Sequence, residues 1–298
     1  MNSSEQLARY RQAGKTAAAA RDFGASIIKE GAKLLDVAEE IESFIVKMGA
    51  KPAFPVNLAL NSVAAHYTPS PYDESVFKSG DVVKIDVGAH IDGYIADTAM
   101  TVEVGALRFQ GMIRAAKSAL DTAVSLMRAG ADMYVIGGAI EAQIKSHGYL
   151  PIRNLTGHGL ENYKLHTGFS VANVPIRGES KPVSGQAVAI EPFATDGIGR
   201  VVDGDVSGIY SLVRAKPQKD PGAEALLNHI IKEYHSLPFA DRWCAKIFSG
   251  KELNSALRSL VRTGCIRPYH ILVEAGGGTV AQAEHTVIVG NDGCEVIT

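Results

Sequence analysis

The strongest constraint on the fold lies in residues 80–102, GDVVKIDVGAHIDGYIADTAMTV, which predict two strands joined at Asp92-Gly93. Asp-Gly between alternating hydrophobic residues favours a type I′ hairpin turn, because both central residues of that turn need positive φ. Apolar residues continue on both sides of the turn, so the hairpin is expected to belong to a buried sheet and not to a solvated edge.

The hairpin brings two acidic side chains together. With a two-residue loop, Asp86 is expected opposite Ala99, and Asp97 opposite Gly88. Side chains alternate along a strand, so the two carboxylates are expected on one face as diagonal neighbours, roughly 7–8 Å apart. An acidic residue on a strand is usually a solvated edge residue. Two carboxylates on a half-apolar face, however, are costly unless a proton or a cation lies between them, so a metal site is the simplest interpretation.

The composition is typical of a soluble globular protein. The chain has 298 residues, which fits one large domain or two smaller ones, and is 46% hydrophobic and 21% charged. Its net charge of −2 argues against a general nucleic-acid or membrane binder. The N-terminal residues are polar and no stretch approaches ~20 apolar residues, so we expect neither a signal peptide nor a membrane span. Cys244, Cys265 and Cys294 have no metal-ligand spacing and are expected to be reduced thiols in a cytoplasmic protein.

Hydrophobic periodicity predicts alternating helical and extended segments along the chain. We expect two helices within residues 4–49, interrupted at Gly24 and Gly31, a loop with a short extended piece at 54–71, helices at about 106–129 and 133–147, an extended glycine-interrupted stretch after residue 153, a strand leading to Glu191, a helical insertion over approximately 208–269, and two strands around a turn at Asn291-Asp292-Gly293.

An internal repeat relates two of these segments. ESVFKSGDVVKID begins at Glu74 and ESKPVSGQAVAIE begins at Glu179, an offset of 179 − 74 = 105 residues that also relates Asp86 to Glu191. A chance match over so short a span is the alternative. A duplicated unit would place both acidic strands about a pseudo-twofold axis, with both carboxylates pointing at one centre.

Further along the chain, more side chains join this acidic pair as candidate metal ligands. Four carboxylates supply −4 against the +4 of two divalent ions, and one neutral imidazole completes the set. Hard oxygen ligands with a single histidine suit Mn²⁺, Fe²⁺, Co²⁺ or Zn²⁺ better than Ca²⁺. The five candidates are Asp86, Asp97, His158, Glu191 and Glu284. On local grounds His285 could replace its neighbour Glu284 as the ligand.

The motifs around these residues resemble the methionine aminopeptidases, specifically the type 2 branch. They are AAHYTP (64–69), KIDVGAHIDGYIADTAMTV (84–102), NLTGHGLENYKLH (154–166), AIEPF (189–193) and AQAEHT (281–286), in the family's order and over nearly the whole chain. The resemblance implies an α+β pita-bread fold, a pseudo-twofold antiparallel sheet flanked by helices, in one catalytic domain over residues 1–298. PFADRW (238–243) resembles part of the type 2 helical insertion, and the absence of a lysine-rich N-terminal extension resembles the archaeal form.

The resemblance implies an activity and a cofactor. The activity is removal of the initiator methionine from nascent chains whose second residue is small, and the cofactor is two divalent ions (Co, Mn, Fe, Zn or Ni). It implies that Asp97 and Glu284 bridge the ions and that His158 binds only the first. Asp86 would complete the shell of the second ion. Glu191 would also bind the first ion and carry a proton from the attacking water to the leaving nitrogen.

The resemblance also implies residues that contact the substrate. His66 and His166 would position and polarise the scissile carbonyl, although each is a loop hydrogen-bonding residue on local grounds. The apolar pocket for the methionine side chain would be lined by Phe54, Leu165, Phe193 and Tyr269, while the roles of Asn57 and Ile209 stay open.

Several alternatives accompany this interpretation. The family match favours Glu284 as the ligand, with His285 structural. Lys251, Arg258 and Arg262 share one helical face, which is either solvated, the favoured interpretation, or a transient contact with ribosomal RNA. We expect a monomer with no membrane or specific DNA partner. The rival functions are a Xaa-Pro peptidase, a branch with a large N-terminal domain not found here, and a non-catalytic ribosome-binding protein, whose relatives lose metal ligands.

Overall fold

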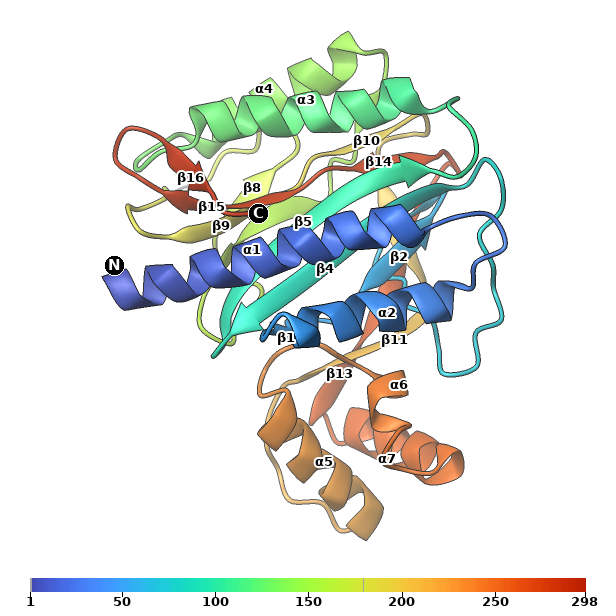
Figure 1. Ribbon diagram of the computed structural model, residues 1–298. Helices are drawn as coiled ribbons and strands as arrows, with labels where there is room; N and C mark the ends of the chain where they lie inside the picture. The colour runs from blue at the N-terminus through green and yellow to red at the C-terminus, as the bar shows by residue number, and fades with distance from the viewer. Residues whose placement is uncertain (1, 179) are drawn as a thin grey trace.

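The predicted hairpin lies at the centre of the fold. The structure, a computed structural model, describes residues 2–178 and 180–298. Strands β4 (Val82–Ile91) and β5 (Tyr94–Glu103) form an antiparallel pair across the whole hairpin (Figure 1). The turn residues Asp92 and Gly93 have φ of 49° and 84°, which confirms the predicted turn chemistry.

The register of the hairpin is also the predicted one. Asp86 pairs with Ala99, and Gly88 pairs with Asp97. Because side chains directly opposite each other in an antiparallel pair share a face, the two aspartates lie on the same side of the sheet.

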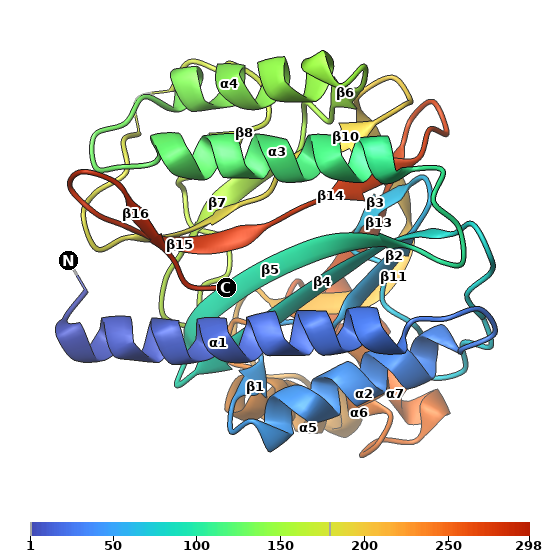
Figure 2. The same cartoon turned by 45° about the horizontal axis from the view of Figure 1, so that its top comes forward.

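One helix pair covers the other face of the hairpin. Helices α1 (Ser4–Ile27) and α2 (Leu34–Lys47) pack on it through a continuous apolar core (Figure 2). The prediction that Gly24 interrupts the first helix is wrong, because Gly24 lies inside α1. A Cβ there would lie 2.6 Å from Cδ1 of Ile41, so this glycine lets the two helices approach closely.

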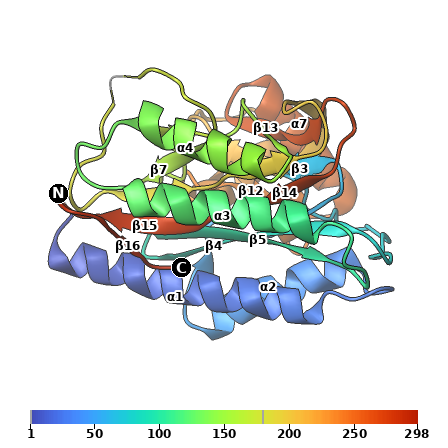
Figure 3. The same cartoon turned by 90° about the horizontal axis from the view of Figure 1, so that it is seen from above.

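A second helix pair covers a second group of strands. Helices α3 (Gln110–Leu126) and α4 (Met133–Ser146) pack on a five-stranded sheet of order β16-β15-β9-β7-β8. Seen from above, β5 and β15 lie between α1 and α3 (Figure 3). Helix α3 begins later than predicted, because the carboxylate of Glu103 accepts the N–H groups of Arg108 and Phe109 at 2.8 and 2.9 Å and holds the preceding turn open.

The two halves carry the signature of the internal repeat. Gly80 and Gly185, equivalent in the repeat, both have positive φ, 89° and 82°, immediately before the strands that lead to the two acids. Asp86 lies on β4 beneath the first helix pair, and Glu191 directly follows β9 (Ala187–Ile190) beneath the second. Glu179, the first residue of the second copy, lies outside the described residues.

The segment predicted as a helical insertion has helices in its middle and strands at both ends. The helices are α5 (Pro221–Glu233), α6 (Asp241–Cys244) and α7 (Gly250–Arg262), and they lie at the end of the molecule opposite α3 and α4 (Figure 1). The helical prediction is wrong for the ends, because β11 (Val201–Leu212) and β13 (Ile266–Glu274) pair with each other. Two register shifts interrupt this pairing and obscure the alternation that marks a strand.

A buried ion pair fixes the insertion to α2. The carboxylate of Glu42 accepts hydrogen bonds from the guanidinium of Arg242 and, at 2.8 Å, from the indole N–H of Trp243. Burial raises the pKa of Glu42, and Arg242 opposes that shift. A buried pair of this kind is costly to break, so it ties the motif PFADRW to the body of the protein.

The remaining strands are short. The predicted loop at 54–71 contains two of them, β2 and β3, and the two strands predicted near residue 292 are confirmed as the antiparallel pair β15 and β16. The bounds are β1 (Lys51–Pro52), β2 (Asn57–Leu60), β3 (Val63–Ala65), β6 (Leu150–Pro151), β7 (Thr156–Leu160), β8 (Ser170–Ala172), β10 (Phe193–Thr195), β12 (Phe239–Ala240), β14 (Val280–Gln282), β15 (His285–Val289) and β16 (Cys294–Val296).

Candidate metal centre

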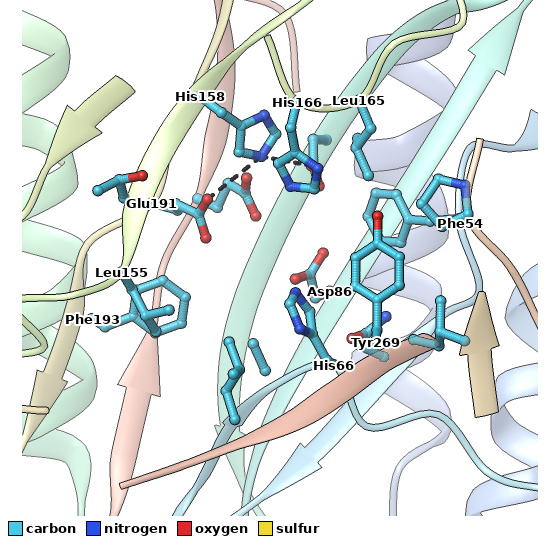
Figure 4. Close-up of a pocket in the computed structure, with 18 of the residues that line it drawn as sticks. Phe54, His66, Asp86, Leu155, His158, Leu165, His166, Glu191, Phe193 and Tyr269 are labelled. Atoms are coloured by element: carbon cyan, nitrogen blue, oxygen red, sulfur yellow. Dashed lines mark ion pairs between the residues drawn. The ribbon is translucent and has the colours of Figure 1, made fainter. Parts of the chain in front are cut away.

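The five predicted metal ligands line one pocket, to which both halves of the fold contribute (Figure 4). Asp86 and Asp97 come from the central hairpin, and His158 comes from β7. Glu191 and Glu284, which were expected on strands, lie just after β9 and just before β15.

Backbone pairing brings Glu284 beside Asp97. It joins the half of the fold that contains the hairpin with α1 and α2 to the half that contains the five-stranded sheet with α3 and α4, and we call this line of contact, at Ala99 and Glu284, the seam. The N–H of Glu284 donates to the carbonyl of Ala99 at 2.9 Å. The hydroxyl of Thr286 accepts from the N–H of Asp97 at 2.8 Å and donates to its carbonyl at 2.7 Å. His285 points away and contacts the Thr298 hydroxyl at 3.0 Å, so the structure places Glu284, and not its neighbour, in the pocket.

The acidic side chains are close together and shielded from water. One ligand atom each from Asp97, His158 and Glu284 lies within 4.8 Å of the others. Nε2 of His158 is 3.6 Å from Oδ2 of Asp97 and 3.5 Å from Oε1 of Glu191. Burial raises the pKa of Asp86 to about 7, and burial together with neighbouring carboxylates raises the pKa values of Asp97, Glu191 and Glu284.

These residues fit divalent cations. Asp86 Oδ1, Asp97 Oδ1 and Glu284 Oε1 are buried and have no hydrogen-bond partner. Within residues 2–178 and 180–298, no lysine or arginine forms an ion pair with any of the four carboxylates. Burial also lowers the pKa of His158 to about 4, which keeps its imidazole neutral, as metal ligation requires. Buried carboxylates without a counterion are costly, and bound cations would remove that cost.

The two predicted substrate histidines also line the pocket, His66 from one side and His166 from another (Figure 4). His66 follows β3 with a φ of 64°, unusual for a residue with a side chain, and its Nδ1 lies 3.2 Å from the carbonyl of His270. That contact requires Nδ1 to donate, which leaves Nε2 as the free acceptor. The ring of His166 lies 4.4 Å from that of His158. Burial lowers the pKa values of both His66 and His166, so both are neutral at pH 7.

The rest of the pocket is largely apolar. The four residues predicted to line it do so, and Asn57 and Ile209, whose roles the sequence left open, line it too. The sequence did not single out six further lining residues: Ala65, Asn154, Leu155, Thr156, Pro238 and Leu272. Three of them, Asn154, Leu155 and Thr156, lie within the motif NLTGHGLENYKLH and so carried a local signal.

Gln282 is a further residue of the centre that the sequence reasoning missed. Its amide nitrogen lies 3.4 Å from carboxylate oxygens of Asp86, Glu191 and Glu284. A neutral amide with two N–H donors can orient carboxylates without cancelling their charge. The signal was its position two residues before Glu284, which puts both side chains on one face.

Comparison with known proteins identifies relatives over nearly the full length. A model of metallopeptidase family M24 matches residues 8–291. A methionine aminopeptidase of Methanothermobacter thermautotrophicus is 46% identical over 291 residues, with 97% of each chain covered. One from Pyrococcus horikoshii is 48% identical, with 96% of this chain and 97% of that chain covered.

Solved structures show the same fold. The structure of a thermophilic Arx1 matches with a TM-score of 0.85 at 17% identity, covering 100% of this chain and 91% of that one. A methionine aminopeptidase from Thermotoga maritima matches with a TM-score of 0.71 at 23% identity, covering 100% and 98%. The predicted α+β pita-bread fold is confirmed.

Proposed function

Because the chain belongs to metallopeptidase family M24, we propose that its acidic pocket holds two divalent metal ions and removes methionine from peptides whose second residue is small. The enzyme is a metallo-aminopeptidase of the archaeal methionine aminopeptidase type. The observation that carries the finer proposal is the convergence of four carboxylates, two of them buried and two half-buried, with one neutral imidazole. Three of the carboxylate oxygens are buried and have no protein partner.

The proposed ligands divide between the two ions as the family resemblance implies. Asp97 and Glu284, side by side across the seam, are the proposed shared ligands. His158 and Glu191 would hold the first ion, and Asp86 the second. When bound, two such ions supply a Lewis acid and lower the pKa of the attacking water. The donor set suits Co, Mn, Fe, Zn or Ni and does not choose among them.

The residues around this centre have complementary roles in the proposal. Glu191 accepts a proton from the attacking water and returns it to the leaving nitrogen, a role that its position in the pocket beside His158 supports. His166, neutral, orients the scissile carbonyl and stabilises charge that develops on its oxygen. His66, whose Nε2 can only accept, holds an N–H of the scissile peptide instead.

The apolar side of the pocket is the proposed site for the methionine side chain. Aromatic edges and aliphatic groups suit a flexible, polarisable thioether. Its walls are Phe54, Leu165, Phe193 and Tyr269, all of which line the same pocket as the acidic centre.

We further propose that residues 1–298 act as one catalytic domain, monomeric and cytoplasmic, with an insertion over approximately 208–269 whose helices lie between the ends of β11 and β13. Within the described residues, no helix combines the length and apolar character needed to cross a membrane. Lys251, Arg258 and Arg262 are exposed on α7, and a solvated face is favoured over a transient ribosome contact.

Metal reconstitution tests the proposal. The protein is stripped with a chelator, Mn²⁺ or Co²⁺ is restored, and hydrolysis of Met-Ala-Ser is compared with that of Ala-Pro-Ala. We expect metal-dependent release of methionine from the first peptide only. Cleavage of Ala-Pro-Ala alone would favour a Xaa-Pro peptidase, and the absence of any metal-dependent release would favour a binding protein. A series of Met-Xaa-Ser peptides with Gly, Ala, Val and Leu as the second residue tests the small-residue preference.

A further inference from the structure

Gly88 lies on the same face of β4 as the acidic pair and leaves a space that an aromatic ring fills. A Cβ at this position would lie 2.2, 2.6 and 2.9 Å from three ring carbons of Phe54. These separations are far shorter than an ordinary contact between carbon atoms. The ring therefore rests directly on the backbone of β4, opposite Asp97 in the ladder.

The backbone conformation does not explain the glycine. Gly88 does not have a positive φ, so an alanine could adopt the same backbone conformation. What the position requires is room for the ring. This distinguishes Gly88 from Gly93 in the same hairpin, whose φ of 84° needs glycine for its own sake.

Phe54 is also held in place by its own backbone. Its neighbour Ala53 donates an N–H to the carbonyl of Gly88 at 2.9 Å, and Pro52 pairs with Ala89. The segment that carries the ring thus runs along β4 and cannot move away without breaking this pairing. A side chain at position 88 would push the ring off the sheet by about 1 Å before the contact became an ordinary one. The open space beside the ring is the pocket that it lines.

We propose that Gly88 is a specificity-determining residue, because the space it leaves for Phe54 sets the depth of the pocket that receives the methionine side chain. This inference rests on the proposed function. Gly88 touches neither substrate nor metal in this account, and it acts only through the position of the Phe54 ring.

Two single variants and their combination test the inference. Gly88→Ala, Phe54→Leu and the double variant are compared with wild type using Met-Ala-Ser and norvaline-Ala-Ser, whose side chain is one atom shorter. In an apolar pocket, a difference of one methylene group changes the discrimination between two substrates by about 10-fold or more. We therefore expect Gly88→Ala to lower the methionine-to-norvaline ratio of kcat/KM about 10-fold, mainly through KM for the methionine peptide. Leucine at position 54 vacates the space, so the double variant should recover a ratio within about threefold of wild type.

Thermal unfolding of the metal-free protein supplies a second readout that does not depend on peptidase activity. Gly88→Ala should lower the melting temperature. Phe54→Leu should change the melting temperature more favourably in the Gly88→Ala background than in wild type. If Gly88→Ala does not fold, the double variant should. The inference would be overturned by an active Gly88→Ala enzyme with an unchanged methionine-to-norvaline ratio of kcat/KM. It would also be overturned if the changes of the two single variants in that ratio and in melting temperature simply added in the double variant, or if the double variant did not fold. A wild-type protein that releases no methionine would instead reject the proposed function, while the unfolding measurements would still report the contact.

Discussion

At the scale of single residues, the pocket depends on carboxylates with which no lysine or arginine among the described residues forms an ion pair. Asp97 is one example, because it is buried, faces His158 and Glu191 and borders Glu284 across the seam. Its position makes it the proposed ligand of both ions, whereas His66 lies at the substrate end of the pocket and touches no carboxylate in the hydrogen bonds of the described residues.

We therefore expect Asp97→Ala to abolish hydrolysis of Met-Ala-Ser more completely than His66→Ala. Loss of a shared ligand removes metal binding, whereas loss of His66 removes only one hydrogen bond to the scissile peptide; the loss of one catalytic hydrogen bond typically costs about 10²–10³ in kcat. The check is kcat at saturating Mn²⁺ together with the metal content of each protein after dialysis. Equal residual rates, or full metal content in Asp97→Ala, would contradict this assignment.

The amide nitrogen of Gln282 lies 3.4 Å from oxygens of three carboxylates and can donate to two of them, so Gln282→Met should weaken metal binding while keeping the size of the side chain. Outer-shell substitutions typically cost about 10- to 100-fold in metal affinity, and we expect a loss in that range for Mn²⁺ by titration calorimetry. His285→Gln is the matched control, because His285 is next to Glu284 in the sequence but its side chain points away from the pocket. If both variants bind Mn²⁺ with wild-type affinity, the amide has no orienting role.

At the scale of secondary-structure elements, the hairpin turn supports more than its own two strands. The N–H of Tyr163 donates to the carbonyl of Gly93 at 2.8 Å, and the amide of Asn162 donates to that of Asp92 at 2.7 Å. The loop held in this way continues directly to Leu165 and His166 in the pocket. The turn therefore positions a loop that lines the pocket and is distant from the turn in sequence.

Gly93→Ala should destabilise the protein and impair catalysis together. The substitution forces a φ of 84° on alanine and places a Cβ 2.3 Å from the ring of Tyr163, so we expect a loss of more than about 1 kcal/mol in the free energy of unfolding. Urea denaturation measures it. Asp92→Asn is the control, since asparagine tolerates positive φ and the exposed contact of Asp92 with Arg9 contributes little. A Gly93→Ala protein as stable as Asp92→Asn would show that the turn is not the constraint described here.

At the scale of the whole molecule, the metal centre joins two halves, each with its own helix pair and core. The acids lie on the seam, so their charge state couples the stability of the metal-free protein to pH. A carboxyl whose pKa is raised in the folded state stabilises the fold below its ordinary pKa, and that contribution is lost as pH rises through the raised value. For Asp86 the raised value is about 7.

The melting temperature of the chelator-treated protein should accordingly fall between pH 6.5 and pH 7.5, the interval in which folded Asp86 loses its proton. Histidines with lowered pKa values, such as His158, act in the opposite sense, but only as pH falls below their ordinary value of 6.5, so this window isolates the carboxyls. Bound divalent ions need deprotonated ligands, so the gap in melting temperature between metal-loaded and metal-free protein should widen as pH rises. Scanning calorimetry at matched ionic strength measures both, and a gap that narrows would argue against a carboxylate-held metal.

How far the sequence predicted this molecule depended on how local each signal was. The Asp92-Gly93 turn and the register that follows from it needed only the turn residues and the alternation around them, and both are confirmed. The pairing of β11 with β13 was not predictable in the same way, because its bulges break the alternation and its partner strands are joined through three helices. Gly24 was misjudged for a related reason, since its role depends on Ile41 in another helix.

The candidate site shows the same difference between local signals, which the sequence reveals, and long-range contacts, which it does not. Motifs identified the residues that the structure brings into one pocket, including Glu284 in preference to His285. Leu272 lacks any pattern that marks it. Pro238 opens the motif PFADRW, but nothing local assigns it to the pocket, because both residues line the pocket only through the tertiary arrangement of the insertion and β13. Gln282 had a signal in its spacing from Glu284, but only the folded structure shows that its amide reaches three carboxylates.

The seam at Ala99 and Glu284 also sets an order of events during biosynthesis. Gln282 and Asp86, which meet in the finished centre, are 196 positions apart, and contacts of such long range form late because the intervening chain must first be brought into place. A chain interrupted between Ser146 and Glu284 would contain the residues of the hairpin and of both helix pairs yet lack a complete acidic centre. Premature termination products are therefore expected to be inert, and catalytic competence coincides with near-completion of translation.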